Sequence, residues 1–145
     1  MRSKGANGVG RFSVEFQVAN QEDMTLAKHG VLATKHVRRQ AITGVVDSGA
    51  AMLVLPQAVA KNLGLPLGGK IKVRYADGRR AQRQEAEGAY IELLGRHGTF
   101  AAVIEPKRKD ALIGAIVLEQ LDLLVDSQRQ KLIPRDPKGP IYEIE

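Results

Sequence analysis

The sequence of 145 residues contains no cysteine and no tryptophan. Without cysteine, the protein has no disulfide, no thiolate metal ligand and no cysteine nucleophile. Aromatic residues make up only 4% of the chain, so its core has to be built from Val, Leu, Ile and Ala. Apolar runs long enough to span a bilayer are also missing. We therefore expect a protein that is soluble as given. The absence of cysteine does not locate it, and its location stays unknown, with the cytoplasm favoured.

Several recurring site motifs are absent as well. The three histidines, His29, His36 and His97, stand outside any HExxH pattern, which argues against a metal site. Ser48 is not part of a G-x-S-x-G elbow, because Val46 occupies the first glycine position. A glycine-rich phosphate loop is missing too. We therefore expect neither a metal nor an organic cofactor.

The chain has a formal charge of +6 and a pI near 9.8, which favours acidic partners. The basic residues are spread over several short clusters and the C-terminal end. Aromatic residues, which would stack on bases in a single-strand platform, do not alternate with them. We interpret the charge as solvated surface and expect no nucleic-acid partner.

Short runs that alternate apolar and polar residues predict β-strands. Pro56 and Gly64 bound a short helix, and a second short helical stretch follows Gly114. Residues 19–36 are mixed and are expected to form a long connection with room for another strand. Many short strands, frequent turns and two brief helices predict an all-β barrel or sandwich. The clearest strand runs are residues 12–18, 42–46, 52–55, 71–75, 89–94 and 99–104.

We expect a single domain, because the chain is long enough for one core and shows no internal repeat. Residues 1–10 are basic and glycine-rich and are predicted to form a flexible N-terminal tail. The domain is expected to occupy residues 11–135. Residues 136–145, rich in proline and charge, are predicted to form a C-terminal tail.

One expected hairpin has an unusual composition. Asp77-Gly78 is a strong hairpin turn signal after the alternating run of residues 71–75. The returning arm, residues 80–87, has almost no apolar face, so it gains little from packing on a core. Two interpretations stay open: an exposed edge hairpin, or a flap that projects over a site and moves.

The stretch ITGVVDSGAAML places Asp47 at the end of an apolar strand. A carboxylate there is costly unless something pairs with it or uses it. In Asp47-Ser48-Gly49 the acid can accept a proton, the hydroxyl can donate a hydrogen bond, and glycine leaves backbone N–H groups near the carboxylate. The tripeptide is also compatible with a simple turn, which is our interpretation of the similar Asp126-Ser127.

The order of these motifs is more specific than any one of them. An acid turn, a hairpin, and then two aliphatic residues and Gly114 before a short helix resemble the retroviral-type (retropepsin-like) aspartic proteases. The phrases VDSGA, LP, LGL, ADGR and LIGAIVLEQLDLLVD are most similar to the bacterial branch of that family. The resemblance covers about residues 10–135, most of the chain.

The resemblance implies a closed β-barrel of the retropepsin type, with one or two short helices, and aspartic endopeptidase activity on a polypeptide substrate. A chain with one acid motif would work as a homodimer, in which two carboxylates share a proton and activate a water. Asp47 would be the catalytic acid, Ser48 the hydroxyl that links the two active-site loops, and Gly49 the point of close backbone approach.

The same resemblance assigns roles to other positions. Ala50 would line the substrate cleft, and Gly114, preceded by Ile113, would pack its turn under the active-site loop. The flap tip, which would contact substrate, is expected at Ala76, Asp77, Gly78 and Arg79.

Some positions depart from the viral pattern. Ala51 and Ala115 stand where viral members commonly have an acid and an arginine that pair. Asp77 and Arg79 make the expected flap tip charged rather than glycine-rich and apolar, so we expect different support for the site and a different flap closure. The alternative function is a non-catalytic dimeric peptide-binding module on the same fold, although such a module would not need Asp47.

Overall fold

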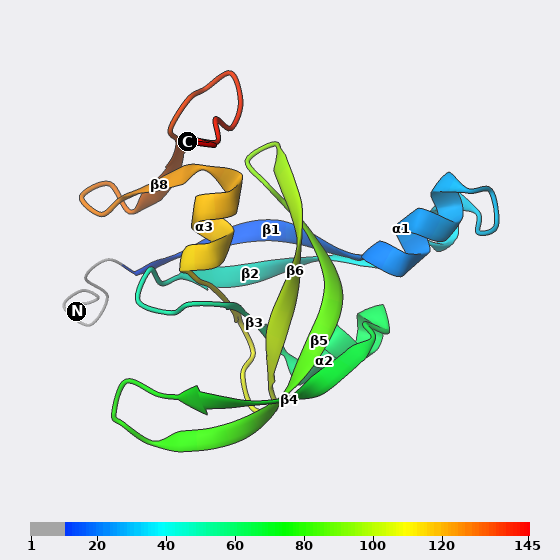
Figure 1. The fold of residues 1–145 in the computed structure, drawn as a ribbon, viewed down its shortest axis with the longest axis horizontal. Helices are drawn as coiled ribbons and strands as arrows, with labels where there is room; N and C mark the ends of the chain where they lie inside the picture. Colours follow the sequence, from blue (N-terminus) through cyan, green and yellow to red (C-terminus); the bar gives the residue numbers. More distant parts are fainter. Residues whose placement is uncertain (1–10) are drawn as a thin grey trace.

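The computed structural model describes residues 11–145, and Figure 1 shows their fold. The predicted N-terminal tail, residues 1–10, lies outside the described residues. The described chain forms β-strands and short helices in the following order: β1 (Phe12–Asn20), α1 (Gln21–Lys28), the 3₁₀ turn η2 (Thr34–His36), β2 (Arg39–Val46), β3 (Leu53–Pro56), α2 (Gln57–Leu63), β4 (Leu67–Arg74), β5 (Arg80–Leu93), β6 (Arg96–Glu105), β7 (Ala111–Ile113), α3 (Ala115–Leu121), β8 (Leu123–Asp126) and β9 (Lys131–Pro134).

Six strands close into a barrel in the order β1-β2-β7-β3-β6-β5. Closure comes from β5, which pairs with β6 along one edge and with β1 along the other. Strand β4 continues the sheet beyond β5 as an edge strand, while β8 and β9 form a separate two-stranded sheet. The predicted all-β fold with a closed barrel is confirmed.

The barrel interior is aliphatic, as the composition requires. Alternate residues of the strands point inward, and residues such as Val18, Leu55, Ile91 and Ile113 are at most 1% exposed. Burial of this kind stabilises the fold by about 2 kcal/mol for each such side chain. The core therefore supplies a rigid frame for the loops at its ends.

Helix α1 occupies a region that the sequence analysis interpreted as connection, and it makes three short α-helices instead of one or two. Asn20 caps it, because its side-chain oxygen accepts a hydrogen bond of 3.0 Å from the Asp23 N–H. The Arg38 Nε atom donates to the Asp23 carboxylate at 2.8 Å. This hydrogen bond lowers the pKa of Asp23, although burial opposes it. The helix is thus held by polar contacts, which apolar periodicity does not reveal.

One parallel and one antiparallel strand pair bring distant turns to one place. Strand β2 runs parallel to β7, with Val46 opposite Ile113, so both strands end at the same edge of the barrel. The turn that follows β2 and the start of α3 after β7 are therefore neighbours. Strand β3 also pairs with β7, at Val54 and Leu112, which places the segment between β2 and β3 beside them.

Hairpin β4–β5 extends away from the barrel, as the lower part of Figure 1 shows. Residues 136–145 contain no helix or strand. They nevertheless contact the end of α3, since the Asp122 carboxylate accepts a hydrogen bond from the Ile141 N–H at 3.0 Å. Among the described helices, none is long and apolar enough to cross a membrane.

Candidate active site

Asp47 follows the last residue of β2 and stays in register with β7. Its N–H donates to the Ile113 carbonyl at 3.0 Å, which continues the ladder one residue past the strand. Val46, the residue before it, is fully buried. The Asp47 side chain is 15% exposed. The strand pair therefore delivers this carboxylate to the barrel edge without burying it.

The turn after Asp47 is built around its carboxylate. The Gly49 N–H donates to Asp47 Oδ1 at 3.0 Å, and the Ala50 N–H donates to the Asp47 carbonyl at 3.1 Å. A fixed N–H donor favours the ionised carboxylate and sets its direction. Ser48, at the tip of the turn, is exposed. The structure thus brings Asp47, Ser48 and Gly49 together in one tight loop.

Gly114 lies directly against this loop. A Cβ atom at Gly114 would lie 2.5 Å from the Met52 carbonyl oxygen and 2.8 Å from the Ala50 carbonyl oxygen. The start of α3 also donates two backbone hydrogen bonds to the loop, from Ala115 N to Ala50 O at 2.8 Å and from Ile116 N to Ala51 O at 3.0 Å. At Ala51 and Ala115, where a charged pair is common in viral members, backbone hydrogen bonds join the two segments.

The second oxygen of the Asp47 carboxylate has a basic neighbour. Arg11, just before β1, places its Nη2 atom 3.1 Å from Asp47 Oδ2. The Arg11 side chain is 52% exposed, so solvent screens this ion pair. Sequence spacing did not predict the contact, because the two residues meet only through the β1–β2 pairing.

A groove of about 440 Å³ begins at this loop and runs under hairpin β4–β5. Gly49, Ala50 and Ala51 contribute to its wall. Its apolar lining comes from the segment just before β3, from the barrel strands and from the hairpin: Met52, Val54, Ile71, Val73, Val103 and Leu112. The groove has the apolar character of a peptide-binding cleft.

The tip of the hairpin is ordered by its own polar groups. Gly78 has a φ of 89°, and the Asp77 carboxylate accepts from the Arg79 N–H at 2.9 Å and from Arg79 Nε at 3.0 Å. These bonds lower the pKa of Asp77. Of the predicted substrate-binding residues, Ala50 lines the groove, whereas Ala76, Asp77, Gly78 and Arg79 lie at the tip beyond its lining.

A cluster that the sequence analysis missed anchors the hairpin to β6. Glu105 accepts a hydrogen bond of 2.6 Å from the Tyr75 hydroxyl and one of 2.6 Å from Arg83 Nε. The bond to Glu105 and burial raise the pKa of Tyr75 above its usual value. The guanidinium carbons of Arg79 and Arg83 lie 4.6 and 5.9 Å from the centre of the Tyr75 ring. Tyr75 and Glu105 also line the groove, so the cluster forms part of its wall.

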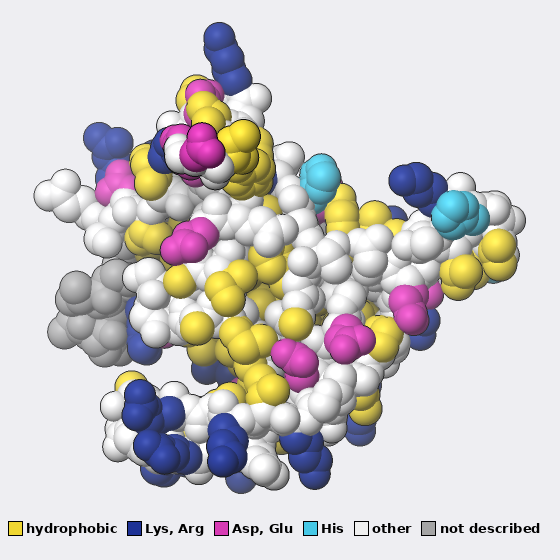
Figure 2. All heavy atoms as spheres, in the orientation of Figure 1, with side chains coloured by type: hydrophobic (Ala, Val, Ile, Leu, Met, Phe, Trp, Pro, Cys, Tyr) yellow, Lys and Arg dark blue, Asp and Glu magenta, His cyan; other side chains and the backbone are white. Residues whose placement is uncertain are grey.

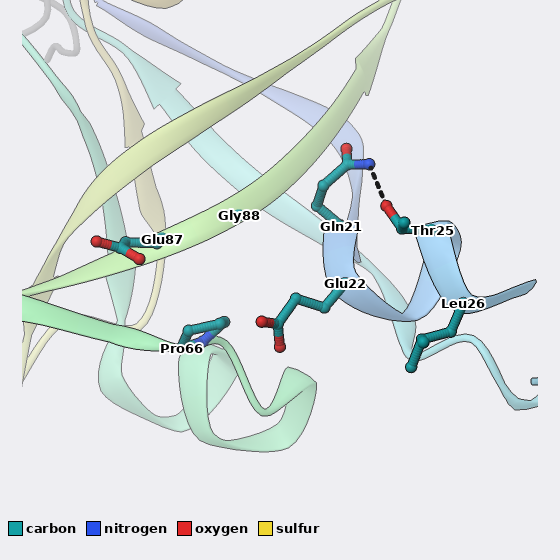
Figure 3. A pocket seen from close by; sticks show the side chains of 7 residues that line it. All are labelled: Gln21, Glu22, Thr25, Leu26, Pro66, Glu87 and Gly88. Atoms are coloured by element: carbon teal, nitrogen blue, oxygen red, sulfur yellow. Dashed lines mark hydrogen bonds between the residues drawn. The ribbon is translucent and has the colours of Figure 1, made fainter. Parts of the chain in front are cut away.

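Another hollow, of about 520 Å³, lies at α1 and away from Asp47 (Figure 3). Its lining includes two carboxylates, Glu22 and Glu87, and two apolar residues, Leu26 and Pro66. Gln21 and Thr25 are joined by a hydrogen bond of 3.3 Å on the helix side. Residues 11–145 contain no group of three or more His, Cys, Asp or Glu side chains that could hold a metal ion. The Asp47 loop lines the groove under the hairpin and not this hollow, so we take the groove beside Asp47 as the candidate active site.

Comparison with protein families identifies this arrangement. The family model described as "gag-polyprotein putative aspartyl protease" matches residues 33–120, well over half of the chain. The chain belongs to this family. The family match includes the Asp47 turn, the whole hairpin and the start of α3. The prediction that the chain belongs to a retropepsin-like aspartyl protease family is confirmed, while the branch of the family stays a prediction.

Two solved structures are among those to which this chain is similar. The crystal structure of the retroviral protease-like domain of Ddi1 from Leishmania major is 21% identical over 66% of this chain and 75% of that chain, with a TM-score of 0.47. The solution structure of Simian Foamy Virus (mac) protease is 14% identical over 76% of this chain and 94% of that chain, with a TM-score of 0.48. A search of curated protein sequences found no match.

Proposed function

We propose that this chain is an aspartic endopeptidase that acts as a homodimer on polypeptide substrates. The observation that carries the proposal is the Asp47 carboxylate, which a backbone N–H orients in a loop that also lines an apolar groove. An oriented, solvent-accessible carboxylate beside a peptide-sized groove is suited to activate a water. Membership of the aspartyl protease family supports the same role.

The chemistry requires a second carboxylate, which a twofold-symmetric dimer supplies from the partner's Asp47. Two carboxylates in close contact share one proton. The ionised one removes a proton from water as the water oxygen bonds to the scissile carbonyl carbon, and the protonated one gives its proton to the carbonyl oxygen. A proton then passes to the amide nitrogen, the C–N bond breaks, and a carboxylic acid and an amine are released.

Arg11 has to be displaced in this mechanism. Its guanidinium occupies the Oδ2 side of Asp47 in the single chain. The Gly49 N–H holds Oδ1, so Oδ2 is the oxygen left to meet the second carboxylate. The exposed ion pair is weak enough to exchange when a dimer forms.

The other residues have supporting roles in this proposal. Ser48 is exposed at the turn and can link the two active-site loops across the dimer axis. Ala50 contacts substrate in the groove, and Ala76, Asp77, Gly78 and Arg79 reach substrate when the hairpin closes. Gly114 and Ile113 keep the loop in position.

We also propose that the catalytic domain spans residues 11–135, with tails on either side, and that the chain belongs to the bacterial branch of the family. The position of β1 to β9 between residues 12 and 134 supports these bounds. The phrases VDSGA and LIGAIVLEQLDLLVD support the branch.

The proposal is tested by incubating the protein with a denatured polypeptide mixture from about pH 3 to about pH 7, a range that brackets carboxylate dyads. We expect cleavage by the wild type and none by Asp47→Asn. Asp126→Asn is the matched control, because Asp126 also begins an Asp-Ser turn, where it accepts a hydrogen bond of 3.1 Å from the Arg129 N–H. It should cleave as the wild type does.

A second measurement tests the source of the second carboxylate. Sedimentation should show a dimer at the concentration at which cleavage occurs. A strict monomer at that concentration would contradict the mechanism. A dimer that cleaves nothing at any pH would favour the alternative, a non-catalytic peptide-binding module.

A further inference from the structure

Among the residues that the structure describes, one carboxylate lines the groove beside Asp47, and that carboxylate is already neutralised. Glu105 lies 2.6 Å from Arg83 Nε, and the Tyr75 hydroxyl donates to its second oxygen at 2.6 Å. The Glu105 side chain is only 13% exposed. It therefore offers little attraction to a cationic group on a substrate.

Three basic residues line the groove without an ion pair in the described chain, Lys72, Arg74 and Arg108, and Arg108 is the one that comes from the barrel side. It belongs to the turn between β6 and β7, is half-buried, and lines the groove. Its Nε atom donates to the Asp110 carbonyl at 2.8 Å, which fixes the plane of the guanidinium. The ion pairs found within residues 11–145 do not include Arg108, and its hydrogen bonds there do not use Nη1 or Nη2. A held guanidinium with two free nitrogens is arranged to bind a carboxylate.

The rest of the groove determines which other groups of a substrate bind next to a carboxylate held by Arg108. Val54, Val103 and Leu112 come from three barrel strands, and Ile71 and Val73 come from the hairpin above them. These side chains are aliphatic and bind apolar groups by burial. An extended chain that fills the groove thus meets an aliphatic surface, the basic side chains of Lys72 and Arg74 on the hairpin, and the held guanidinium of Arg108 on the barrel side.

We propose that the site selects polypeptides that carry an Asp or Glu side chain next to an apolar segment, and that Arg108 is the residue that makes this selection. The inference rests on the proposed function of the same groove, whose substrate class it names. The carboxylate of the substrate forms a charge-assisted pair with Arg108 while the neighbouring apolar side chain lies on the aliphatic lining.

A basic residue of the hairpin outside the groove lining, Arg80, provides a matched control. Lys70 and Arg80 lie outside the groove lining, whereas Lys72 and Arg74 belong to it, and the register places Arg74 opposite Arg80. None of these four forms an ion pair within the described chain. Figure 2 shows Lys and Arg side chains gathered over the hairpin in the lower part of the view. They can attract acidic chains in general, but Arg80 is not part of the groove lining.

The first test maps the cleavage sites in a denatured polypeptide mixture for the wild type, Arg108→Glu and Arg80→Glu. We expect Asp and Glu to be enriched about tenfold beside the scissile bond for the wild type, since one charge-assisted pair in a half-buried site gives a factor of this size. Arg108→Glu should replace that enrichment by one for Lys and Arg, whereas Arg80→Glu should keep it. Cleavage without acidic enrichment, or enrichment lost in Arg80→Glu and kept in Arg108→Glu, would overturn the assignment.

The second test does not depend on catalysis. Binding of two fluorescent peptides to Asp47→Asn is measured by anisotropy; both contain a central Phe-Leu, flanked by Glu in one and by Lys in the other. We expect the Glu peptide to bind about tenfold more tightly, and the difference to disappear in Asp47→Asn/Arg108→Ala and to shrink at high salt. Equal binding of the two peptides contradicts the inference even where the enzyme cleaves. A preference without any cleavage retains the inference and refutes the protease.

Discussion

The Asp47 turn and hairpin β4–β5 form two sides of one groove, yet they are held in different ways. Backbone groups fix the turn. The Ile113 carbonyl accepts a hydrogen bond from it, the Ala115 N–H donates one to it, and Gly114 packs against its carbonyl oxygens. The hairpin depends on side chains, because Tyr75 and Arg83 bind Glu105 on β6. Side-chain bonds near solvent break and form at lower cost than a backbone ladder inside a barrel.

This difference matches the proposed task of each side of the groove: the Asp47 turn has to hold a precise position, and the hairpin has to move. An acid that must meet a second acid within hydrogen-bonding distance tolerates little displacement. A cover over the substrate has to open and close, as the lids of many enzymes do. The fold thus holds the Asp47 turn by backbone contacts that are costly to break, and it holds the hairpin by side-chain contacts that break more easily. The following changes test that contrast.

The largest effect is expected at Gly114. Gly114→Ala places a methyl group within 3 Å of two carbonyl oxygens of the Asp47 loop, and backbone atoms there cannot move aside cheaply. We expect the free energy of unfolding to fall by about 3 kcal/mol in urea denaturation. Gly69→Ala in β4 is the control, because a Cβ atom there meets nothing within 4 Å, so it should change stability far less. Equal losses in both variants would show that the loop is not the tighter region.

A smaller and more local effect is expected at Glu105. Glu105→Gln removes the charge that binds Arg83, so the hairpin loses its anchor while the barrel stays intact. We expect amides of residues 70–75 to exchange with solvent about tenfold faster, with the free energy of global unfolding lowered by less than about 1 kcal/mol.

Glu15→Gln is the control for that measurement, since Glu15 is exposed on β1 and forms no ion pair within residues 11–145. Hairpin amides should exchange in this variant as they do in the wild type. A global loss of stability in Glu105→Gln, with all amides affected alike, would show that the hairpin and the barrel unfold as one unit.

The smallest effect concerns the Tyr75 hydroxyl. Its pKa is raised in the folded protein by the bond to Glu105, so this bond stabilises the fold below the ordinary phenol pKa of about 10 and is lost as the pH rises through the higher folded value. Spectroscopic titration of phenolate should show one tyrosine whose pKa falls in Glu105→Gln. Tyr75→Phe identifies that tyrosine, and a wild-type titration unchanged by Glu105→Gln would contradict the assigned contact.

Local signals in the sequence explain which features could be predicted. The alternating run before Asp77-Gly78 predicted the hairpin, and Pro56 with Gly64 predicted α2, which begins at Gln57 and ends at a left-handed Gly64. The interpretation of Asp126-Ser127 as a simple turn is confirmed, because Asp126 ends β8 and Ser127 begins the turn that leads into β9. Each of these depends on residues a few positions apart.

Contacts between distant residues escaped prediction for the opposite reason. Arg11 meets Asp47, and Glu105 meets Tyr75 and Arg83, only after the barrel has brought their strands together. Helix α1 was missed because Asn20 and the Asp23–Arg38 pair hold it, rather than an apolar stripe. The roles of Asp47, Ser48 and Gly49 in catalysis stay predictions that the proposed experiments test.

Strand β4 lies at the edge of the sheet, and within residues 11–145 its outer backbone groups face no neighbouring strand. An open edge of this kind can pair with the same edge of another copy and start aggregation. The chain interrupts its regularity there with a register shift between Leu67 and Lys70, and Lys70, Lys72 and Arg74 place like charges along it. Two such edges repel each other, so the hairpin can extend into solvent while copies of the chain are kept from joining there into fibres.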